Sequence, residues 1–171
     1  EPERRNFSEN ILTMSHQMRD LVTGLLELAR VDAGAIHATF APLDFSTLVS
    51  DAVLPFEPVY FEQGLSFESA VEPSLFVNGC AAHLQQTVEV LLDNAQKYSQ
   101  QDGDVRLTLE RRGRHCLLCV SDTGVPISSE DLQNIFKRFY RADHARSTNH
   151  SYGLGLSIAA SFIKEHHGKI W

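Results

Sequence analysis

The feature that most constrains this chain is a heptad pattern of apolar residues near its start. Seven apolar residues follow one another at alternating spacings of four and three: Phe7, Ile11, Met14, Met18, Leu21, Leu25 and Leu28. This spacing places them along one side of a helix, which we expect over about residues 2–31, ending near Gly34. At about 1.5 Å per residue such a helix is roughly 45 Å long, more than a small domain can cover. It therefore predicts a partner helix; the alternative is an ordinary amphipathic helix lying on its own domain.

After Gly34 the apolar pattern changes to that of a mixed α/β domain. We expect strands over about residues 36–41, 65–70, 75–78, 105–112 and 115–122. We expect helices over about residues 45–63, 81–98, 129–134 and 154–166. The run GKIW at 168–171 looks like the beginning of a further strand. The sequence thus predicts an α/β fold preceded by one long helix.

Charge and composition limit the class of ligand. The 171 residues carry a formal net charge of -7, whereas a nucleic-acid binder normally presents a basic face. We therefore expect no nucleic-acid partner, although a local group of Lys and Arg can still hold an anion. No apolar run reaches the roughly 18–20 residues that a membrane-crossing helix needs, and no signal peptide opens the sequence. We expect no membrane contact from this part of the protein.

The cysteines indicate a reducing compartment rather than a disulfide framework, because their number is odd. Cys116 and Cys119 form a single C-x-x-C, but the run HCLLCV is typical of a strand. Side chains three apart on a strand point to opposite faces, which disfavours a shared metal or redox site. We expect both to be core residues.

The segment LLDNAQKYS carries the first candidate site residues. On a helix, Asn94 shares a face with Lys97 and Tyr98. An Asn carbonyl oxygen can bind Mg²⁺ and a Lys can meet a phosphate, so this face suits a nucleotide. The alternative is a surface ion pair between Asp93 and Lys97, which are four residues apart.

A second candidate lies at the end of the strand predicted over 115–122. Leu118, Val120 and Asp122 point to one face, so a carboxylate ends an apolar row, where it needs a hydrogen-bond donor. The exocyclic amine of adenine is one such donor, and a turn capped by the aspartate is the alternative. Gly124 follows, where a turn needs a flexible backbone or a base needs close approach.

The third candidate is the run YGLGLSIAASFIKEHHG. Gly153 and Gly155 open a helix, and bare N–H groups at a helix start form a natural phosphate site. The thirteen residues RADHARSTNHSYG just before the helix could form a lid over a ligand. A plain loop before a capped helix is the alternative.

Taken in order, these motifs resemble those of a known family. DNAQKYS, DTG, FKRFY and GLGLSIA are similar to the asparagine box, first glycine box, phenylalanine box and second glycine box of sensor histidine kinases of two-component systems. The spacings match, and the resemblance covers essentially the whole chain. It implies the Bergerat (GHKL-type) two-layer α/β sandwich, with ATP and Mg²⁺ held between the helices and a lid. The implied activity is transfer of the ATP γ-phosphoryl group to a histidine, for relay to a response regulator.

The resemblance also implies an ATP-binding set within these motifs. Its members are Asn94, Lys97, Tyr98, Asp122, Gly124, Ile127, Phe136, Phe139, Gly153, Leu154, Gly155 and Leu156. Asn94 would ligate Mg²⁺, Lys97 would approach the phosphates, and Asp122 would accept a hydrogen bond from the adenine amine. Tyr98 would line the pocket. The two phenylalanines would seat the lid, and the two glycines of the GLG run would contact phosphate.

The first helix contains a histidine that resembles the family's phosphoacceptor only superficially. Residues 15–21, SHQMRDL, lack both the acid and the proline of the typical S-H-E-L-R-T-P-L. Too few residues separate His16 from the helix end for the rest of a hairpin. The run MSHQMRDLVTGLLELARVDAG instead resembles the family's second hairpin helix. We therefore expect that His16 does not accept the phosphoryl group.

Three positions depart from the family pattern inside its motifs. Val90 stands where a second Asn is common, Pro126 where the first glycine box has its second Gly, and Ser151 where the second glycine box has its leading Gly. Pro126 lacks an N–H and fixes its backbone, so a phosphate or lid contact can be lost there. These changes favour the alternative to an enzyme, a nucleotide-binding or degenerate module of the same fold that acts through its helix.

The expected organisation is a second hairpin helix at residues 1–34, then an ATP-binding catalytic domain at 35–171, trimmed at its C-terminus. The histidine-bearing helix and the final strand would then lie outside the chain. For the parent protein, the resemblance implies a homodimer through the hairpin helices and a response regulator receiver domain as partner. It also implies a cytoplasmic position in a membrane-anchored bacterial sensor.

Overall fold

The computed structural model describes residues 11–12, 14–15, 18–19, 21–26, 29, 39–142 and 152–171. Helical residues between 11 and 29 come first along the chain. The elements that follow are β1 (Ala41–Asp44), α2 (Phe45–Val53), α3 (Phe56–Glu62), β2 (Ser66–Val71), β3 (Phe76–Gly79), α4 (Ala81–Tyr98), β4 (Asp104–Arg112), β5 (His115–Asp122), α5 (Ser129–Leu132) and α6 (Gly155–Glu165).

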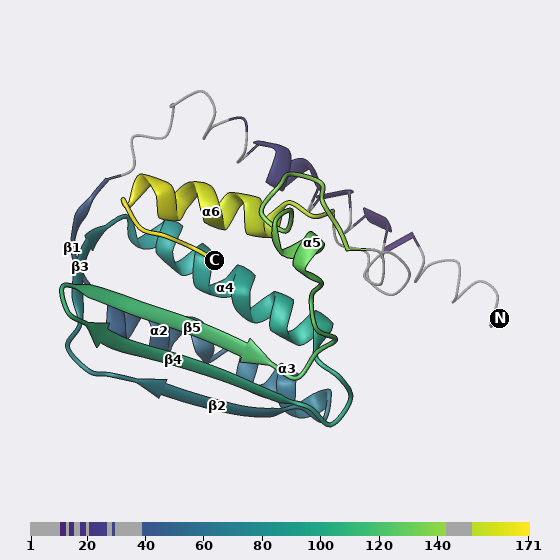
Figure 1. The fold of residues 1–171 in the computed structure, drawn as a ribbon, viewed down its shortest axis with the longest axis horizontal. Coiled ribbons are helices and arrows are strands. Elements are labelled where there is room, and N and C mark those ends of the chain that lie inside the picture. Colours follow the sequence, from purple (N-terminus) through teal and green to yellow (C-terminus); the bar gives the residue numbers. More distant parts are fainter. Residues whose placement is uncertain are drawn as a thin grey trace.

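The strands form a mixed three-stranded sheet and a separate small pair. The larger sheet has the order β2-β4-β5, with β2 parallel to β4 and β4 antiparallel to β5. β1 pairs with β3 in antiparallel register. The parallel pair needs a crossover connection, and this connection contains β3 and α4. Helices gather against one face of the sheet (Figure 1), which gives the two-layer α/β sandwich predicted from the sequence.

The core lies between the sheet and α4. Apolar residues alternate along the strand β4 and recur every three or four residues along α4, so each element has one apolar face. In β4, Val105, Leu107 and Leu109 are buried while the intervening Arg106 is exposed. Buried residues of α4 recur every three or four positions and form the other half of this contact: Leu84, Val88, Leu92 and Ala95. On the opposite face of the sheet Arg106 pairs with Glu68 across β2 and β4 at 2.6 Å. One layer of helices therefore covers this sheet.

Tyr60 anchors α4 from α3. Its side chain is fully buried, and its hydroxyl donates a 2.8 Å hydrogen bond to the Leu92 carbonyl oxygen. Burial raises the pKa of the Tyr60 phenol far above its usual value, and the carboxylates of Asp93 and Asp122 raise it further. The phenol therefore stays protonated and holds the half of α4 that carries the candidate site.

Replacing Tyr60 with Phe should lower the free energy of unfolding by about 1 kcal/mol, because one buried hydrogen bond is lost with little change of shape. Urea titration checks this through a lower midpoint at an unchanged slope. Phe61, on the same helix, is 84% exposed, so Phe61→Leu is the matched control and should leave the midpoint in place. Equal midpoints for Tyr60→Phe and wild type would contradict the anchoring role.

The end of α6 is tied to the start of α4. Nε2 of His166 accepts a hydrogen bond from the Cys80 N–H at 2.9 Å, and its Nδ1 lies 2.7 Å from the Phe162 carbonyl oxygen. The His83 ring stacks on Phe162 with a centroid separation of 4.0 Å. Since the end of α6 lies at the start of α4, the two helices run antiparallel. Gly155, the first residue of α6, therefore lies beside the second half of α4.

Two elements differ from the predicted boundaries because of local chemistry and strand pairing. The helix expected over 45–63 is two helices, since Pro55 lacks the N–H that would continue α2. The first strand is Ala41–Asp44 rather than 36–41; residues 39–40 are in no strand, and 36–38 lie outside the described residues. Its position is set by pairing with β3, from Ala41 with Gly79 to Asp44 with Phe76.

The strand expected at 168–171 is also wrong. These residues are described but adopt no strand, because they pair with no strand of the described chain. Ile170 and Trp171 instead line a cavity next to α4. The helix expected over 129–134 ends at Leu132.

The described residues between 11 and 29 are helical, as the heptad pattern predicts. Ile11, Met14 and Met18 are 49%, 65% and 70% exposed, so this apolar side is open for a partner helix, which stays a prediction. Leu21 instead packs against α6. Phe7, Leu28 and His16 lie outside the described side chains.

The cysteine prediction is half correct. Cys116 packs against the core, but Cys119 is exposed, since it lies on the opposite face of β5. Within the described residues, no three His, Cys, Asp or Glu side chains come together as a metal site. Nor does any helix of those residues have the length and apolar character needed to cross a membrane.

Candidate functional site

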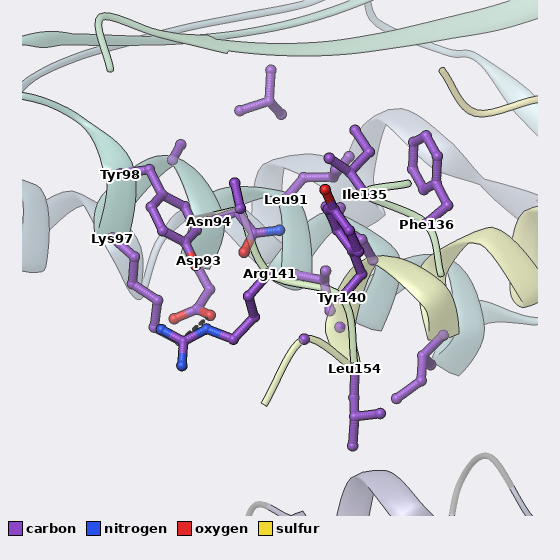
Figure 2. A pocket seen from close by; sticks show the side chains of 18 of the residues that line it. Leu91, Asp93, Asn94, Lys97, Tyr98, Ile135, Phe136, Tyr140, Arg141 and Leu154 are labelled. Atoms are coloured by element: carbon purple, nitrogen blue, oxygen red, sulfur yellow. Dashed lines mark hydrogen bonds and ion pairs between the residues drawn. The ribbon is translucent and has the colours of Figure 1, made fainter. Parts of the chain in front are cut away.

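A cavity of about 1030 Å³ lies between α4, the start of α6 and the segment that follows β5 (Figure 2). It brings all four predicted motifs together. The members of the predicted ATP-binding set that line it are Asn94, Lys97, Tyr98, Asp122, Ile127, Phe136, Gly153, Leu154, Gly155 and Leu156. Gly124 and Phe139 are not among its lining residues. The fold thus gathers in one place residues that the sequence separates widely.

Asn94 lies on the cavity side of α4, with its amide nitrogen buried. Its Nδ2 is buried and has no hydrogen-bond partner among the described residues. A buried polar group of this kind costs free energy unless a ligand or water meets it. The amide carries a donor and an acceptor, so Asn94 is positioned to contact a ligand in the cavity.

Lys97 forms an ion pair with Asp93, one turn earlier on α4. The surface ion pair considered from the sequence is therefore present, and both residues also line the cavity. Their side chains are 36% and 43% exposed, and ion pairs at such exposure contribute little to stability. An anionic ligand can therefore recruit Lys97. Arg141 lines the same cavity, and its side chain points toward this pair (Figure 2).

Asp122 ends β5 at the cavity and caps the turn that follows. Its Oδ1 accepts a 2.7 Å hydrogen bond from the Gly124 N–H. The capping alternative is therefore present, and it engages one of the two carboxylate oxygens. Gly124 packs against the end of α4, where an added Cβ would lie 2.4 Å from the Tyr98 carbonyl oxygen. Gly124 thus sets the approach of the Asp122 turn to α4 rather than lining the cavity.

Phe139 and Gly153 join the two ends of the segment between them. The Phe139 N–H donates to the Gly153 carbonyl oxygen at 3.0 Å. Gly153 has a φ of 68°, and an added Cβ would lie 2.4 Å from the Tyr140 carbonyl oxygen, so only glycine fits. The Phe139 side chain is 58% exposed. Among the described contacts, Phe139 therefore takes part in this junction through its backbone N–H. Ser151 lies outside the described residues.

Tyr140 fastens this junction to α5. Its hydroxyl donates a 2.6 Å hydrogen bond to Oδ1 of Asp131, whose Oδ2 accepts from the Ser128 hydroxyl at 2.7 Å. The hydrogen bond to Asp131 is the main cause that raises the pKa of Tyr140. The phenol therefore stays a donor and holds Tyr140 at the cavity wall.

α6 begins at the cavity without a side-chain cap. The N–H groups of an uncapped first turn can bind an anion. Gly155 approaches α4 closely, since an added Cβ would lie 3.2 Å from Cγ1 of Val90. Val90 and Pro126 both line the cavity, so two of the three departures from the family pattern lie in the site itself.

Several lining residues were missed from the sequence. Arg19, Thr23 and Gly24 of the first helix line the cavity, as do Tyr140 and Arg141. Signals for some of them existed. An isolated Gly inside a helical pattern, such as Gly24, often has a packing reason, and Arg141 directly follows the FKRFY motif.

Known proteins resemble this chain in both sequence and structure. Residues 79–171 match the family described as histidine kinase-, DNA gyrase B-, and HSP90-like ATPase. Sensor protein DltS of Streptococcus agalactiae serotype III is 30% identical over 166 residues, 96% of this chain and 42% of DltS. The mycobacterial sensor histidine kinase MprB has a TM-score of 0.66 at 30% identity, covering 74% of this chain and 82% of that one. Full-length ShkA in complex with AMPPNP has a TM-score of 0.72 at 27% identity, covering 85% of this chain and 30% of that one.

The residues that match the family include the motifs that line the cavity. The matched residues run from the end of β3 through α6 and so include every motif that lines it. The chain spans less than half the length of DltS. On this evidence the chain belongs to the histidine kinase-, DNA gyrase B-, and HSP90-like ATPase family, as a GHKL-type histidine kinase ATPase domain.

Proposed function

We propose that this chain binds Mg²⁺-ATP in the cavity between α4 and α6 and is the catalytic domain of a sensor histidine kinase. The observation that carries the proposal is the buried Nδ2 of Asn94, which has no hydrogen-bond partner among the described residues. It faces a cavity whose other walls hold the carboxylate of Asp122, the cations Lys97 and Arg141, and the uncapped start of α6. The AMPPNP bound to ShkA supports a nucleotide as the ligand.

Each wall would contribute a different part of the nucleotide contact. Asp122 would accept from the adenine amine, and the N–H groups at the start of α6 would hold phosphate oxygens. Lys97 would leave Asp93 to meet the negative charge of the phosphates. Asn94 would bind Mg²⁺ through Oδ1, and the ion would neutralise charge on the phosphates. The protein would thus act mainly by positioning the γ-phosphoryl group.

The accepting histidine and the partners are further parts of this proposal. We propose that the phosphoryl group goes to a histidine other than His16, and from there to a response regulator receiver domain. The parent protein would dimerise through hairpin helices that include the first helix, whose exposed Ile11, Met14 and Met18 support such pairing. The description of DltS as a sensor protein supports a place in a sensor, which we propose to be membrane-anchored with this chain on its cytoplasmic side.

Calorimetric titration with AMPPNP, with and without Mg²⁺, tests this function. We expect saturable binding that the metal strengthens by about tenfold or more, since Asn94 and the phosphates would both supply oxygen ligands to it. Absence of binding under both conditions would reject the ATP-binding proposal and favour a module that acts through its helix. Equal affinity with and without the metal would reject Asn94 as its ligand.

Asp122→Asn tests the adenine contact with little change to the turn, because the new Oδ1 can still accept from the Gly124 N–H. ITP differs from ATP in carrying a carbonyl in place of the adenine amine, so the carboxylate of wild type should prefer ATP. We expect the variant to weaken ATP binding by about tenfold and to lose most of this preference. Competition between the two nucleotides against labelled AMPPNP measures both. A preference for ATP that survives the substitution would remove Asp122 from the adenine contact.

A further inference from the structure

The first helix supplies one wall of the nucleotide cavity. Arg19, Thr23 and Gly24 line it together with Asn94 and Gly155. All three residues of the helix precede the family match at 79–171. This wall therefore lies outside the residues that match the family description.

The first helix packs closely against the start of α6. Gly24 is buried, and an added Cβ would lie 3.1 Å from Cδ1 of Leu154. Leu21, one turn earlier, packs against the buried cluster of Leu154, Ile158 and Phe162. Figure 1 shows these helical residues crossing near the start of α6. The contact places the helix next to the residues where phosphate would bind.

Arg19 is the charged residue that the helix brings to this place. It lies four residues before Thr23, so both are on the helix face that lines the cavity. A guanidinium is planar and can donate two parallel hydrogen bonds to a phosphate. The other cations on the lining, Lys97 and Arg141, come from α4 and from the segment after β5.

We propose that the first helix completes the nucleotide site, with Arg19 contacting the polyphosphate and Gly24 holding the helix against Leu154. This inference rests on the proposed function. It assigns the helix a direct part in binding the nucleotide, in addition to any pairing through its exposed apolar side. The cavity would lose a basic group and a wall whenever the helix left α6.

A nucleotide series separates a phosphate contact from a general loss of structure. Calorimetry with AMPPNP, ADP, AMP and adenosine, all in Mg²⁺, is run on wild type, Arg19→Gln and the control Arg114→Gln. Arg114 is an exposed residue of the β4–β5 turn, outside the cavity lining. We expect Arg19→Gln to weaken AMPPNP and ADP by about tenfold and to change adenosine by less than about twofold. Arg114→Gln should follow wild type for all four.

Gly24→Leu independently tests the packing of the first helix against Leu154. Leu favours helix more than Gly does, but its side chain does not fit against Leu154 at this distance. We expect the variant to weaken AMPPNP by about the same factor as Arg19→Gln. Adding Arg19→Gln to it should then change nothing more, because Arg19 has already left the cavity. Thermal unfolding confirms that the variant keeps the folded core.

The outcomes divide clearly. Two results together support the inference. Arg19→Gln loses affinity only for the nucleotides that carry a polyphosphate, and the double variant binds AMPPNP no more weakly than Gly24→Leu alone. Unchanged or higher AMPPNP affinity in Arg19→Gln overturns it, the latter because the helix would then compete with the nucleotide. An equal loss for adenosine and AMPPNP also overturns it. Failure of wild type to bind any of the four would reject the proposed function and this inference with it.

Discussion

Asn94→Ala is expected to weaken Mg²⁺-AMPPNP binding by about 30- to 100-fold while leaving the protein at least as stable as wild type. The loss of affinity, about 2–3 kcal/mol, follows from removing the proposed Mg²⁺ ligand in a partly buried site. The stability follows from the structure, since the amide Nδ2 is buried without a partner among the described residues. Ala removes that desolvation cost and is a better helix former. We expect a gain of about 0.5–1 kcal/mol in the free energy of unfolding.

Calorimetry and urea titration measured on the same preparations check both halves of this prediction. Gln96, two residues later on α4, does not line the cavity, so Gln96→Ala is the matched control and should change neither quantity much. A variant with wild-type affinity would show that Asn94 is not a ligand. A variant that loses both stability and affinity would show that its amide supports the fold.

Gly124→Ala should have the largest effect on stability, lowering the free energy of unfolding by about 2–3 kcal/mol. The added Cβ would lie 2.4 Å from the Tyr98 carbonyl oxygen and 2.5 Å from Oδ1 of Asp122. Both atoms are fixed, the first by α4 and the second by its hydrogen bond to the Gly124 N–H. The turn must therefore move away from α4 and carry Asp122 with it. We expect nucleotide affinity to fall as well, although Gly124 does not line the cavity.

Urea titration and AMPPNP calorimetry measure these two losses, and Gly113 provides the contrast. No atom lies within 4 Å of a Cβ added at Gly113, but its φ is 63°, a conformation that Asn tolerates. Gly113→Asn should therefore shift the urea midpoint little and leave binding intact. Similar behaviour of Gly124→Ala and Gly113→Asn would show that the turn relaxes freely and that the close approach to α4 has no consequence.

The elements that the sequence predicted best are those with long, unambiguous periodicity. α4 and β5 begin and end at the predicted residues, because each has an apolar face, buried in α4 and partly buried in β5, that packs against the core. Elements that depend on a partner were placed less well. β1 lies where β3 pairs with it, and residues 168–171 pair with no described strand. Neither outcome can be predicted from the apolar pattern of the segment itself.

The candidate site also contains residues that could be predicted from the sequence and residues that could not. The residues on α4 and at the end of β5 could be predicted because their chemistry and spacing are local. Arg19 and Gly24 could not, since their place depends on how the first helix packs against Leu154. For Asp122 the sequence left a capping role and a ligand role open. Its bond to Gly124 leaves the second carboxylate oxygen for a ligand, so the two roles are compatible.

The mixed sheet also determines the order in which the site is assembled during folding. β4 and β5 are joined by residues 113–114 alone and can pair early as a local hairpin. β2 pairs with β4 only after the crossover that contains β3 and α4 has closed, and closing a long loop costs entropy before the pairing rewards it. α4 carries Asn94 and Lys97, so the nucleotide site becomes complete late. A nucleotide that binds only the finished site would therefore act mainly by slowing unfolding rather than by speeding folding.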